Sequence, residues 1–156
     1  MKTLLTTLAL TTALTVPGLA SARPVTFSTQ MTDYYGNNAY FAMYVTNANG
    51  AYVGSLWMAG GNARYYRHLS GWYQATGGDA AQVSGITGAS VGSGRSVKVT
   101  LDLQDALFDA GYVLHVDAAV ENMPESPKEI VVPLSKANLG KAIGGRRYIK
   151  SLTITE

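Results

Sequence analysis

Apolar residues recur at every second position in several short segments of the chain. In the segment 97–103 one face holds Val97, Val99, Leu101 and Leu103, and the other holds Lys98, Thr100 and Asp102. In the segment 112–121 the apolar face is longer and holds Tyr112, Leu114, Val116, Ala118 and Val120, opposite His115, Asp117, Ala119 and Glu121. Successive side chains of a strand point to opposite faces, so this period of two predicts half-buried β-strands.

Two further segments predict a β-hairpin. Residues 40–47 place Phe41, Met43 and Val45 on one face and Tyr40, Ala42 and Tyr44 on the other. Asn49 and Gly50 follow, and both residue types tolerate the positive φ that a two-residue hairpin turn requires. Residues 52–58 return as the partner strand.

The remaining segments complete the fold prediction. Residues 25–31 and 130–134 read as strands, with Pro133 suited to a sheet edge, and a last strand ends at Leu152 and Ile154. The segment Arg64 to Tyr73 reads either as a strand with a bulge at Ser70-Gly71 or as an irregular crossover. Seven or eight short strands without a long helical period predict an all-β, immunoglobulin-like antiparallel sandwich, in a single domain over residues 23–156.

Residues 1–22 have the features of a secretory signal peptide. Lys2 provides a positive start, an apolar run lies between Leu4 and Leu14, and Ala20-Ser21-Ala22 has the small residues of a cleavage site. The apolar run is shorter than the roughly 20 residues that a membrane-spanning helix needs. We therefore predict export to the periplasm or secretion, and no membrane span after signal removal.

Composition and charge limit the function further. The chain has no cysteine, which excludes disulfides, thiolate metal sites and thiol catalysis. Loss of Lys2 with the signal peptide leaves 11 cations against 10 acids, so nucleic acid is not an expected partner. Residues 99–127 nevertheless hold six acids and no cation, while residues 128–150 hold six cations and one acid. This contrast indicates either two solvated segments that attract each other, or a basic edge at Lys136 to Lys150 that faces an anionic partner or membrane surface.

A glycine-rich segment, residues 77–94, lies between predicted strands. It has six glycines and hydroxyl residues at Ser84, Thr87, Ser90 and Ser93. Long loops of this kind inside compact domains are usually functional or disordered, and we expect a flexible, exposed loop.

Within this segment, Gly88 to Gly92 fits the G-x-S-x-G pattern of a hydrolase nucleophile at Ser90. That motif requires a strand before the serine and a helix directly after it, whereas a loop and a strand are predicted here. The chain has two histidines, His68 and His115, on separate segments and without metal-ligand spacing. We therefore expect neither a serine hydrolase nor a metal site, and a structural role for His115.

An aromatic and basic cluster precedes the glycine-rich segment. Its members are Arg64, Tyr65, Tyr66, Arg67, Trp72 and Tyr73. Such a cluster suits the stacking of a planar ligand, a sugar or a flavin ring. The alternative, which we favour at this stage, is a sheet face with half-buried tyrosines.

Several of these features together resemble the DUF2271 family of predicted periplasmic proteins. They are the Trp57 strand, the Leu69 to Trp72 stretch, the turn Thr87-Gly88-Ala89-Ser90, Asp102-x-x-Asp105 leading to Gly111-Tyr112, and the outward acids Asp117 and Glu121. The resemblance covers about residues 40–121. The family usually has a tryptophan and a glycine around the first of those aspartates, whereas this chain has Leu101 and Leu103.

The resemblance implies a place in electron transfer. Proteins of this kind look like accessory partners of membrane-bound redox systems with PepSY-type domains and flavin transferases. The transferase that attaches FMN through a phosphoester prefers an acidic residue, two spacers, and then Ser/Thr-Gly-Ala-Thr/Ser. Residues 84–90 match its second half, with Thr87, Gly88 and Ala89 before Ser90 as the acceptor, and Ser84 at the acidic position.

We therefore expect an exported, non-catalytic accessory module that carries FMN on Ser90 and meets a membrane-bound redox protein or a flavin transferase. The alternative is a cofactor-free binding or assembly module. It would use Arg64, Tyr66, Arg67, Trp72 and Tyr73 as its contact surface.

Overall fold

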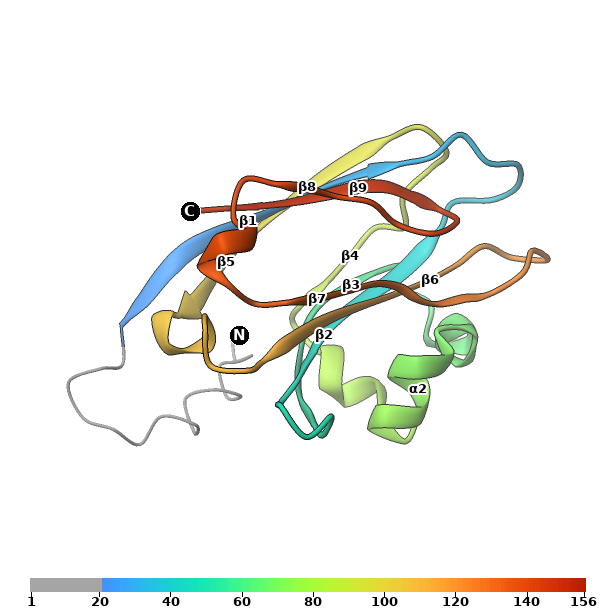
Figure 1. Cartoon of the computed structure of the whole chain (residues 1–156). Helices are drawn as coiled ribbons and strands as arrows, with labels where there is room; N and C mark the ends of the chain where they lie inside the picture. The colour runs from blue at the N-terminus through green and yellow to red at the C-terminus, as the bar shows by residue number, and fades with distance from the viewer. Residues whose placement is uncertain (1–20) are drawn as a thin grey trace.

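The computed structural model describes residues 21–156, which form two β-sheets packed face to face (Figure 1). The strands are β1 (Ala22–Met31), β2 (Tyr40–Thr46), β3 (Tyr52–Ala59), β4 (Thr87–Gly88), β5 (Ser96–Gln104), β6 (Val113–Ala119), β7 (Ser126–Pro133), β8 (Ala142–Ile143) and β9 (Ile149–Thr155). The helices are η1 (Ala63–His68), α2 (Ser70–Thr76), η2 (Ala80–Val83), η3 (Asp105–Leu107) and η4 (Lys136–Asn138). The predicted signal peptide lies outside the described residues, apart from Ser21 and Ala22.

The predicted β-sandwich is confirmed. One sheet has the order β5-β1-β9-β8 and the other the order β4-β3-β2-β6-β7, which makes nine strands within residues 21–156. The number is higher than the predicted seven or eight because β4 and β8 span two residues each, too few for an alternating pattern to appear. β4 pairs parallel with β3, and the other pairings in the described sheets are antiparallel.

The two faces of β2 are buried in two different cores. Phe41, Met43 and Val45 pack between the two sheets, whereas Ala42 and Tyr44 pack on the outer face of the five-stranded sheet. The predicted alternation is therefore confirmed for this strand. It is also confirmed for the apolar faces of 97–103 and 112–120, whose residues are buried or partly buried and, apart from Val99, belong to the core between the sheets.

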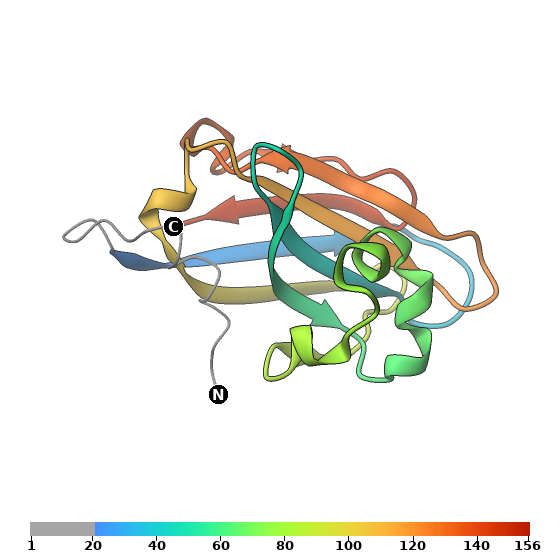
Figure 2. The same cartoon turned by 90° about the horizontal axis from the view of Figure 1, so that it is seen from below.

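A helical layer covers the outer face of the five-stranded sheet. Figures 1 and 2 show η1, α2 and η2 together against β2, β3 and β6 on the side away from the other sheet. The prediction of a strand or an irregular crossover for Arg64 to Tyr73 is therefore wrong. The buried side chains there are Tyr66, Leu69 and Trp72, and this spacing of three residues suits helical turns rather than a strand.

The predicted β2–β3 hairpin is confirmed, but its turn differs from the prediction. The backbone N–H of Asn47 donates to the carbonyl of Ala51 at 2.9 Å, which leaves a three-residue loop. Gly50 has a φ of 83°, whereas Asn49 does not enter the positive-φ region. The Asn47 side-chain oxygen accepts from the N–H groups of Asn49 and Ala51 at 2.9 and 3.0 Å, so it stabilises the longer turn.

Asp117 attaches the helical layer to the sheet. The sequence pattern places it on an outward face of β6, but its side chain is 0% exposed because α2 covers it. One carboxylate oxygen accepts the N–H of Trp72 at 2.6 Å, and the other accepts the N–H of Lys128 at 3.0 Å. Leu69, at the N-cap of α2, makes no side-chain capping bond, so the cap comes from Asp117 on a different element.

Glu129 links the two sheets in a similar way. Its side chain is 1% exposed. One oxygen accepts four consecutive backbone N–H groups, those of Arg146, Arg147, Tyr148 and Ile149, at 2.8 to 2.9 Å. The other accepts the hydroxyl of Ser126 at 2.5 Å. Because Glu129 is in β7 and the four amides lead into β9, this single carboxylate connects strands of different sheets.

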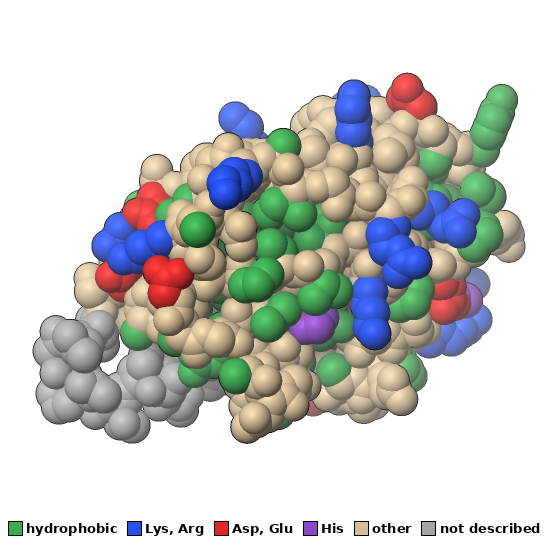
Figure 3. Space-filling model, viewed as in Figure 1, with side chains coloured by type: hydrophobic (Ala, Val, Ile, Leu, Met, Phe, Trp, Pro, Cys, Tyr) green, Lys and Arg blue, Asp and Glu red, His purple; other side chains and the backbone are tan. Residues whose placement is uncertain are grey.

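The basic segment itself lies at the surface. Its cationic side chains, Lys136, Lys141, Arg146, Arg147 and Lys150, are exposed. Figure 3 shows Lys and Arg side chains around a group of apolar side chains on the face that β7 and β8 present. One direct ion pair joins this segment to the acidic one, since Lys136 Nζ lies 3.9 Å from Asp105 Oδ1. An anionic partner for the basic edge stays a prediction.

Replacement of Glu129 by Gln should destabilise the fold strongly. A glutamine has one acceptor oxygen, and its NH₂ group would face either the backbone amides or the Ser126 hydroxyl. We expect Glu129→Gln to lower the free energy of unfolding by roughly 2 to 4 kcal/mol in urea titrations. Glu121→Gln is the matched control at an exposed position and should change it by less than about 0.5 kcal/mol. Equal effects of the two substitutions would contradict the role of Glu129.

Asp117 should make stability depend on pH in a defined direction. Burial raises the pKa of Asp117 above its ordinary value of 3.8, although the N–H groups of Lys128 and Trp72 act in the opposite direction. The folded chain therefore keeps the Asp117 carboxyl proton up to a higher pH than the unfolded chain does. Between the two pKa values, the contribution of Asp117 to stability falls as pH rises.

The test compares the wild type with Asp117→Asn, which does not titrate. The free energy of unfolding of the wild type minus that of the variant should fall as pH rises from about 4 toward neutrality. This difference should level off above the raised pKa of Asp117. A difference that rises with pH would mean that the hydrogen bonds from the backbone amides lower the pKa of Asp117 by more than burial raises it.

Candidate functional site

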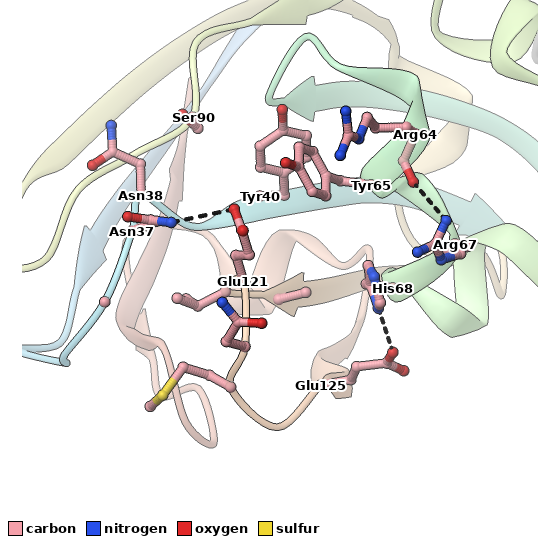
Figure 4. A pocket seen from close by; sticks show the side chains of 15 residues that line it. Asn37, Asn38, Tyr40, Arg64, Tyr65, Arg67, His68, Ser90, Glu121 and Glu125 are labelled. Atoms are coloured by element: carbon pink, nitrogen blue, oxygen red, sulfur yellow. Dashed lines mark hydrogen bonds and ion pairs between the residues drawn. The ribbon is translucent and has the colours of Figure 1, made fainter.

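A groove of about 940 Å³ lies where the helical layer meets the loops at one end of the five-stranded sheet. Four segments form its walls: the β1–β2 loop, η1, the loop before β5, and the β6–β7 loop. Their lining residues include Asn37, Asn38, Tyr40, Arg64, Tyr65, Arg67, His68, Ser90, Glu121 and Glu125 (Figure 4). The volume is in the range that small-molecule ligands and cofactors occupy in proteins.

Two tyrosines form the aromatic part of the groove. The rings of Tyr40 and Tyr65 meet edge to face, with centroids 5.6 Å apart and planes at 73°. The guanidinium carbon of Arg64 lies 5.2 Å from the centroid of the Tyr65 ring. Figure 4 shows both rings between Ser90 on one side and Arg64 on the other. The two rings therefore lie in the middle of the groove, between the hydroxyl residue Ser90 and the cation of Arg64.

Polar contacts join the β6–β7 loop to the other walls. Asn37 Nδ2 donates to Glu121 Oε1 at 3.2 Å, and His68 Nδ1 lies 2.8 Å from Glu125 Oε2 (Figure 4). The side chains of His68 and Glu125 are each 40% exposed, so this pair is solvated and contributes little to stability. These contacts therefore link the walls of the groove at its solvated surface.

The local sequence explains how η1 presents its cations. The side chain of Asn62 accepts the N–H of Arg64 at 3.2 Å and caps the first turn of η1. The helix then places Tyr66 inward and leaves Arg64 and Arg67 exposed. Tyr66 donates its hydroxyl to the Gly60 carbonyl at 3.0 Å, and burial raises its pKa, so it is neutral.

The groove combines some residues of both predicted sites. Ser90 is from the predicted cofactor site and Arg64 and Arg67 are from the predicted aromatic and basic surface, and all three line the groove. Tyr73 is 40% exposed and is not among the lining residues.

Two residues of the predicted contact surface are not at the surface. Trp72 is 0% exposed and Tyr66 is 4% exposed. Their rings pack edge to face at 5.5 Å, and the Trp72 indole N–H donates to Ser55 Oγ at 2.9 Å. The spacing of these residues on η1 and α2 turns them toward the sheet. The favoured alternative, a sheet face with half-buried tyrosines, is also wrong in placing the segment in a strand.

The glycine-rich segment is more ordered than the sequence suggests. Thr87 and Gly88 pair with β3, and the Thr87 hydroxyl donates to the Val83 carbonyl at 2.8 Å. Ala39 and Val91 exchange two backbone hydrogen bonds at 2.7 and 2.9 Å. Ala89 and Ser90 therefore lie between two anchored points, with Ala89 exposed and Ser90 half-buried. The prediction of a flexible loop is wrong for this part of the segment.

The packing of the chain explains why position 88 is a glycine. A Cβ at this position would overlap the indole ring of Trp57, so glycine lets the ring lie against the backbone. The Trp57 strand and the Thr-Gly-Ala-Ser turn, which both contribute to the family resemblance, are in direct contact.

The arrangement around Ser90 does not form a hydrolase triad. His68 and Glu125 pair in the groove, but Figure 4 places Ser90 on the opposite side, and no hydrogen bond joins these two described residues, Ser90 and His68. No helix follows Ser90 directly: Val91 bridges to Ala39 before β5 begins. A nucleophile and its base need hydrogen-bond reach, although the contact is often looser before substrate binds.

The ring of His115 is packed and hydrogen-bonded, as expected for a structural residue. Its ring stacks on Tyr44 at 5.1 Å, and its Nε2 lies 2.9 Å from the Thr46 hydroxyl. Burial lowers its pKa, with a smaller opposing effect from Asp117.

Sequence reasoning missed most of the polar groove residues. Asn37, Asn38 and Glu125 lie in loops that carry no periodic signal, whereas Glu121 was predicted as an outward residue of the 112–121 strand but not as a site residue. Tyr65 and His68 belong to the aromatic and basic stretch and could have been found there. A prediction of helix for that stretch would have placed Tyr65 and His68 on a different face from Tyr66 and Trp72.

Within residues 21–156, no helix combines the length and apolar character that crossing a bilayer requires. No curated protein and no solved structure is similar enough to this chain to count as a match. A family model does match, over residues 22–151, and it is described as a predicted periplasmic protein, DUF2271. This description agrees with the periplasmic location that the N-terminal sequence predicts. The match covers well over half of the chain, and the protein therefore belongs to the DUF2271 family.

Proposed function

We propose that this periplasmic protein is a non-catalytic accessory module of a flavin- and PepSY-type electron-transfer system, and that it carries FMN esterified to Ser90. The observation that supports this proposal is the shared groove. Ser90 ends the Thr-Gly-Ala-Ser segment and lines the same groove as Tyr65 and Arg64.

The residues of the groove suit a flavin. The Tyr40 and Tyr65 rings offer apolar faces for a planar tricyclic ring, and the groove volume of about 940 Å³ leaves room for it. Arg64 and Arg67 are exposed cations on the same wall and would stabilise negative charge on the ring system. Bound FMN would supply one- and two-electron chemistry, while the chain sets its position and electrostatic environment.

The attachment step is a phosphoryl transfer carried out by a separate transferase. The Ser90 hydroxyl oxygen would form a bond to the FMN phosphorus of a flavin adenine dinucleotide. The pyrophosphate bond would break, AMP would leave, and the hydroxyl proton would pass to a base of the transferase. Two backbone bonds between Ala39 and Val91 restrain the acceptor segment on one side, so local opening there would give the enzyme access.

A second candidate is a cofactor-free binding module that uses the same groove. The observation that favours it is the restraint on Ser90, which lies between β4 and the Ala39–Val91 bridge. In this case Arg64, Tyr65 and Arg67 would bind a soluble ligand or a peptide of a partner, in place of the predicted surface that includes Tyr66 and Trp72.

Co-expression with a flavin transferase tests the first candidate. We expect the intact mass of the exported chain to rise by FMN less water, and the protein to absorb as a flavin. Ser90→Ala should abolish both signals because it removes the acceptor oxygen. Ser84→Ala, a change of an exposed serine in the same segment, should retain them. Ser84→Asp restores the acidic position of the transferase motif and should increase the modified fraction.

The outcomes separate the two candidates. An unmodified wild type, under conditions that modify a control substrate of the same transferase, would contradict flavin attachment. In that case Arg64→Ala and Tyr65→Ala should weaken ligand or partner capture, while Lys150→Ala, at an exposed position on β9, should not. Unchanged capture with both groove variants would contradict the binding module.

A further inference from the structure

Strand β5 is an open edge of its sheet. It has nine residues, Ser96–Gln104, and pairs only with β1 in the described sheets. Figure 2 shows this strand as the outermost member of its sheet. A long edge strand offers a row of unpaired N–H and C=O groups to any other extended chain, so proteins usually block such edges or fill them.

The charges along this edge are arranged symmetrically and with opposite sign. Lys98 lies two positions before Thr100, and Asp102 lies two positions after it. All three side chains are exposed on the outward face of the sheet. Beyond the strand, Asp105 in η3 already pairs with Arg23 Nη2 at 3.1 Å, so the pattern consists of Lys98 and Asp102.

Thr100 is also the midpoint of β5. In a symmetric antiparallel pair of identical strands, the twofold axis passes between the two copies of one residue. With the axis at Thr100, all nine residues of each strand find a partner. Lys98 of each copy then lies opposite Asp102 of the other, and Ser96 lies opposite Gln104.

We propose that two copies of this chain associate through their β5 edges, antiparallel and centred on Thr100. Each four-stranded sheet would continue into the other and form one eight-stranded sheet across the dimer. On the inner face Val97 would lie opposite Leu103, and Val99 opposite Leu101. Val97 and Leu101 are only partly buried at the margin of the core, so the partner strand would cover apolar surface that one copy leaves accessible.

The same charges oppose the other ways of pairing. An axis at Lys98 or at Asp102 would bring two like charges face to face and shorten the overlap. A parallel, in-register pair would place Lys98 opposite Lys98 and Asp102 opposite Asp102. Like charges directly opposite each other in a sheet are destabilising. The edge therefore favours its own copy in one register and discourages unrelated strands.

A single strand edge is a small interface, so we expect a weak dimer whose population depends on concentration. Sedimentation equilibrium of the mature, exported chain measures it. Lys98→Asp and Asp102→Lys should each weaken self-association by roughly tenfold or more, because two attractive pairs become two repulsive ones. Lys150→Asp changes the charge of an exposed residue on β9 and should leave the association constant unchanged.

The decisive measurement mixes the two charge-reversed variants. In a heterodimer, Asp at position 98 of one chain faces Lys at position 102 of the other, and the second pair is the original Asp102 facing the original Lys98. An equimolar mixture should therefore regain the wild-type association constant, and so should the double exchange Lys98→Asp/Asp102→Lys. A wild type that stays monomeric at millimolar concentration, or a mixture no more associated than its components, would overturn the proposal.

Discussion

Buried carboxylates that accept backbone amides hold the layers of this protein together. Glu129 in β7 accepts hydrogen bonds from four backbone N–H groups that lead into β9, and so links one sheet to the other. Asp117 in β6 accepts a hydrogen bond from the backbone N–H of Trp72 and links the helical layer to the outer face of the five-stranded sheet. In a chain without cysteine, these two side chains act at the layer junctions where exported proteins often use disulfides. η1, which forms one wall of the groove, directly precedes the helix that Asp117 caps.

The periodic part of the sequence predicted the sandwich well, because its information is local. The alternation in β2, β5 and β6 assigns each side chain to a face without reference to any other segment. The helical layer was missed for the same reason. Tyr66, Leu69 and Trp72 repeat every three residues over too short a span to register as a helix, and their aromatic and branched character resembles that of a strand. Asp117 shows a further limit: its position in an alternating strand indicates solvent, and only the packing of α2 makes it interior.

The groove could not be predicted from any one segment, because it is assembled from four. Ser90 and Arg64 were each singled out, for different reasons, and the fold brings them to one cavity. The loops that supply Asn37 and Glu125 have no periodicity or motif, and their relation to the other walls of the groove arises only from the tertiary structure. Prediction of the order in the glycine-rich segment failed because glycine content indicates conformational freedom, whereas pairing partners on β3 and at Ala39 remove it.

The contact between Gly88 and Trp57 links two distant positions of the chain into one unit. A Cβ at Gly88 would overlap Cζ2 of Trp57, so a larger residue there requires either a shift of the indole ring or a smaller residue in place of the tryptophan. Variation at the two sites is therefore expected to be coupled among related chains, whether or not a neighbouring hydroxyl is ever modified. Glycine at this position is therefore explained by its packing against the tryptophan beside it.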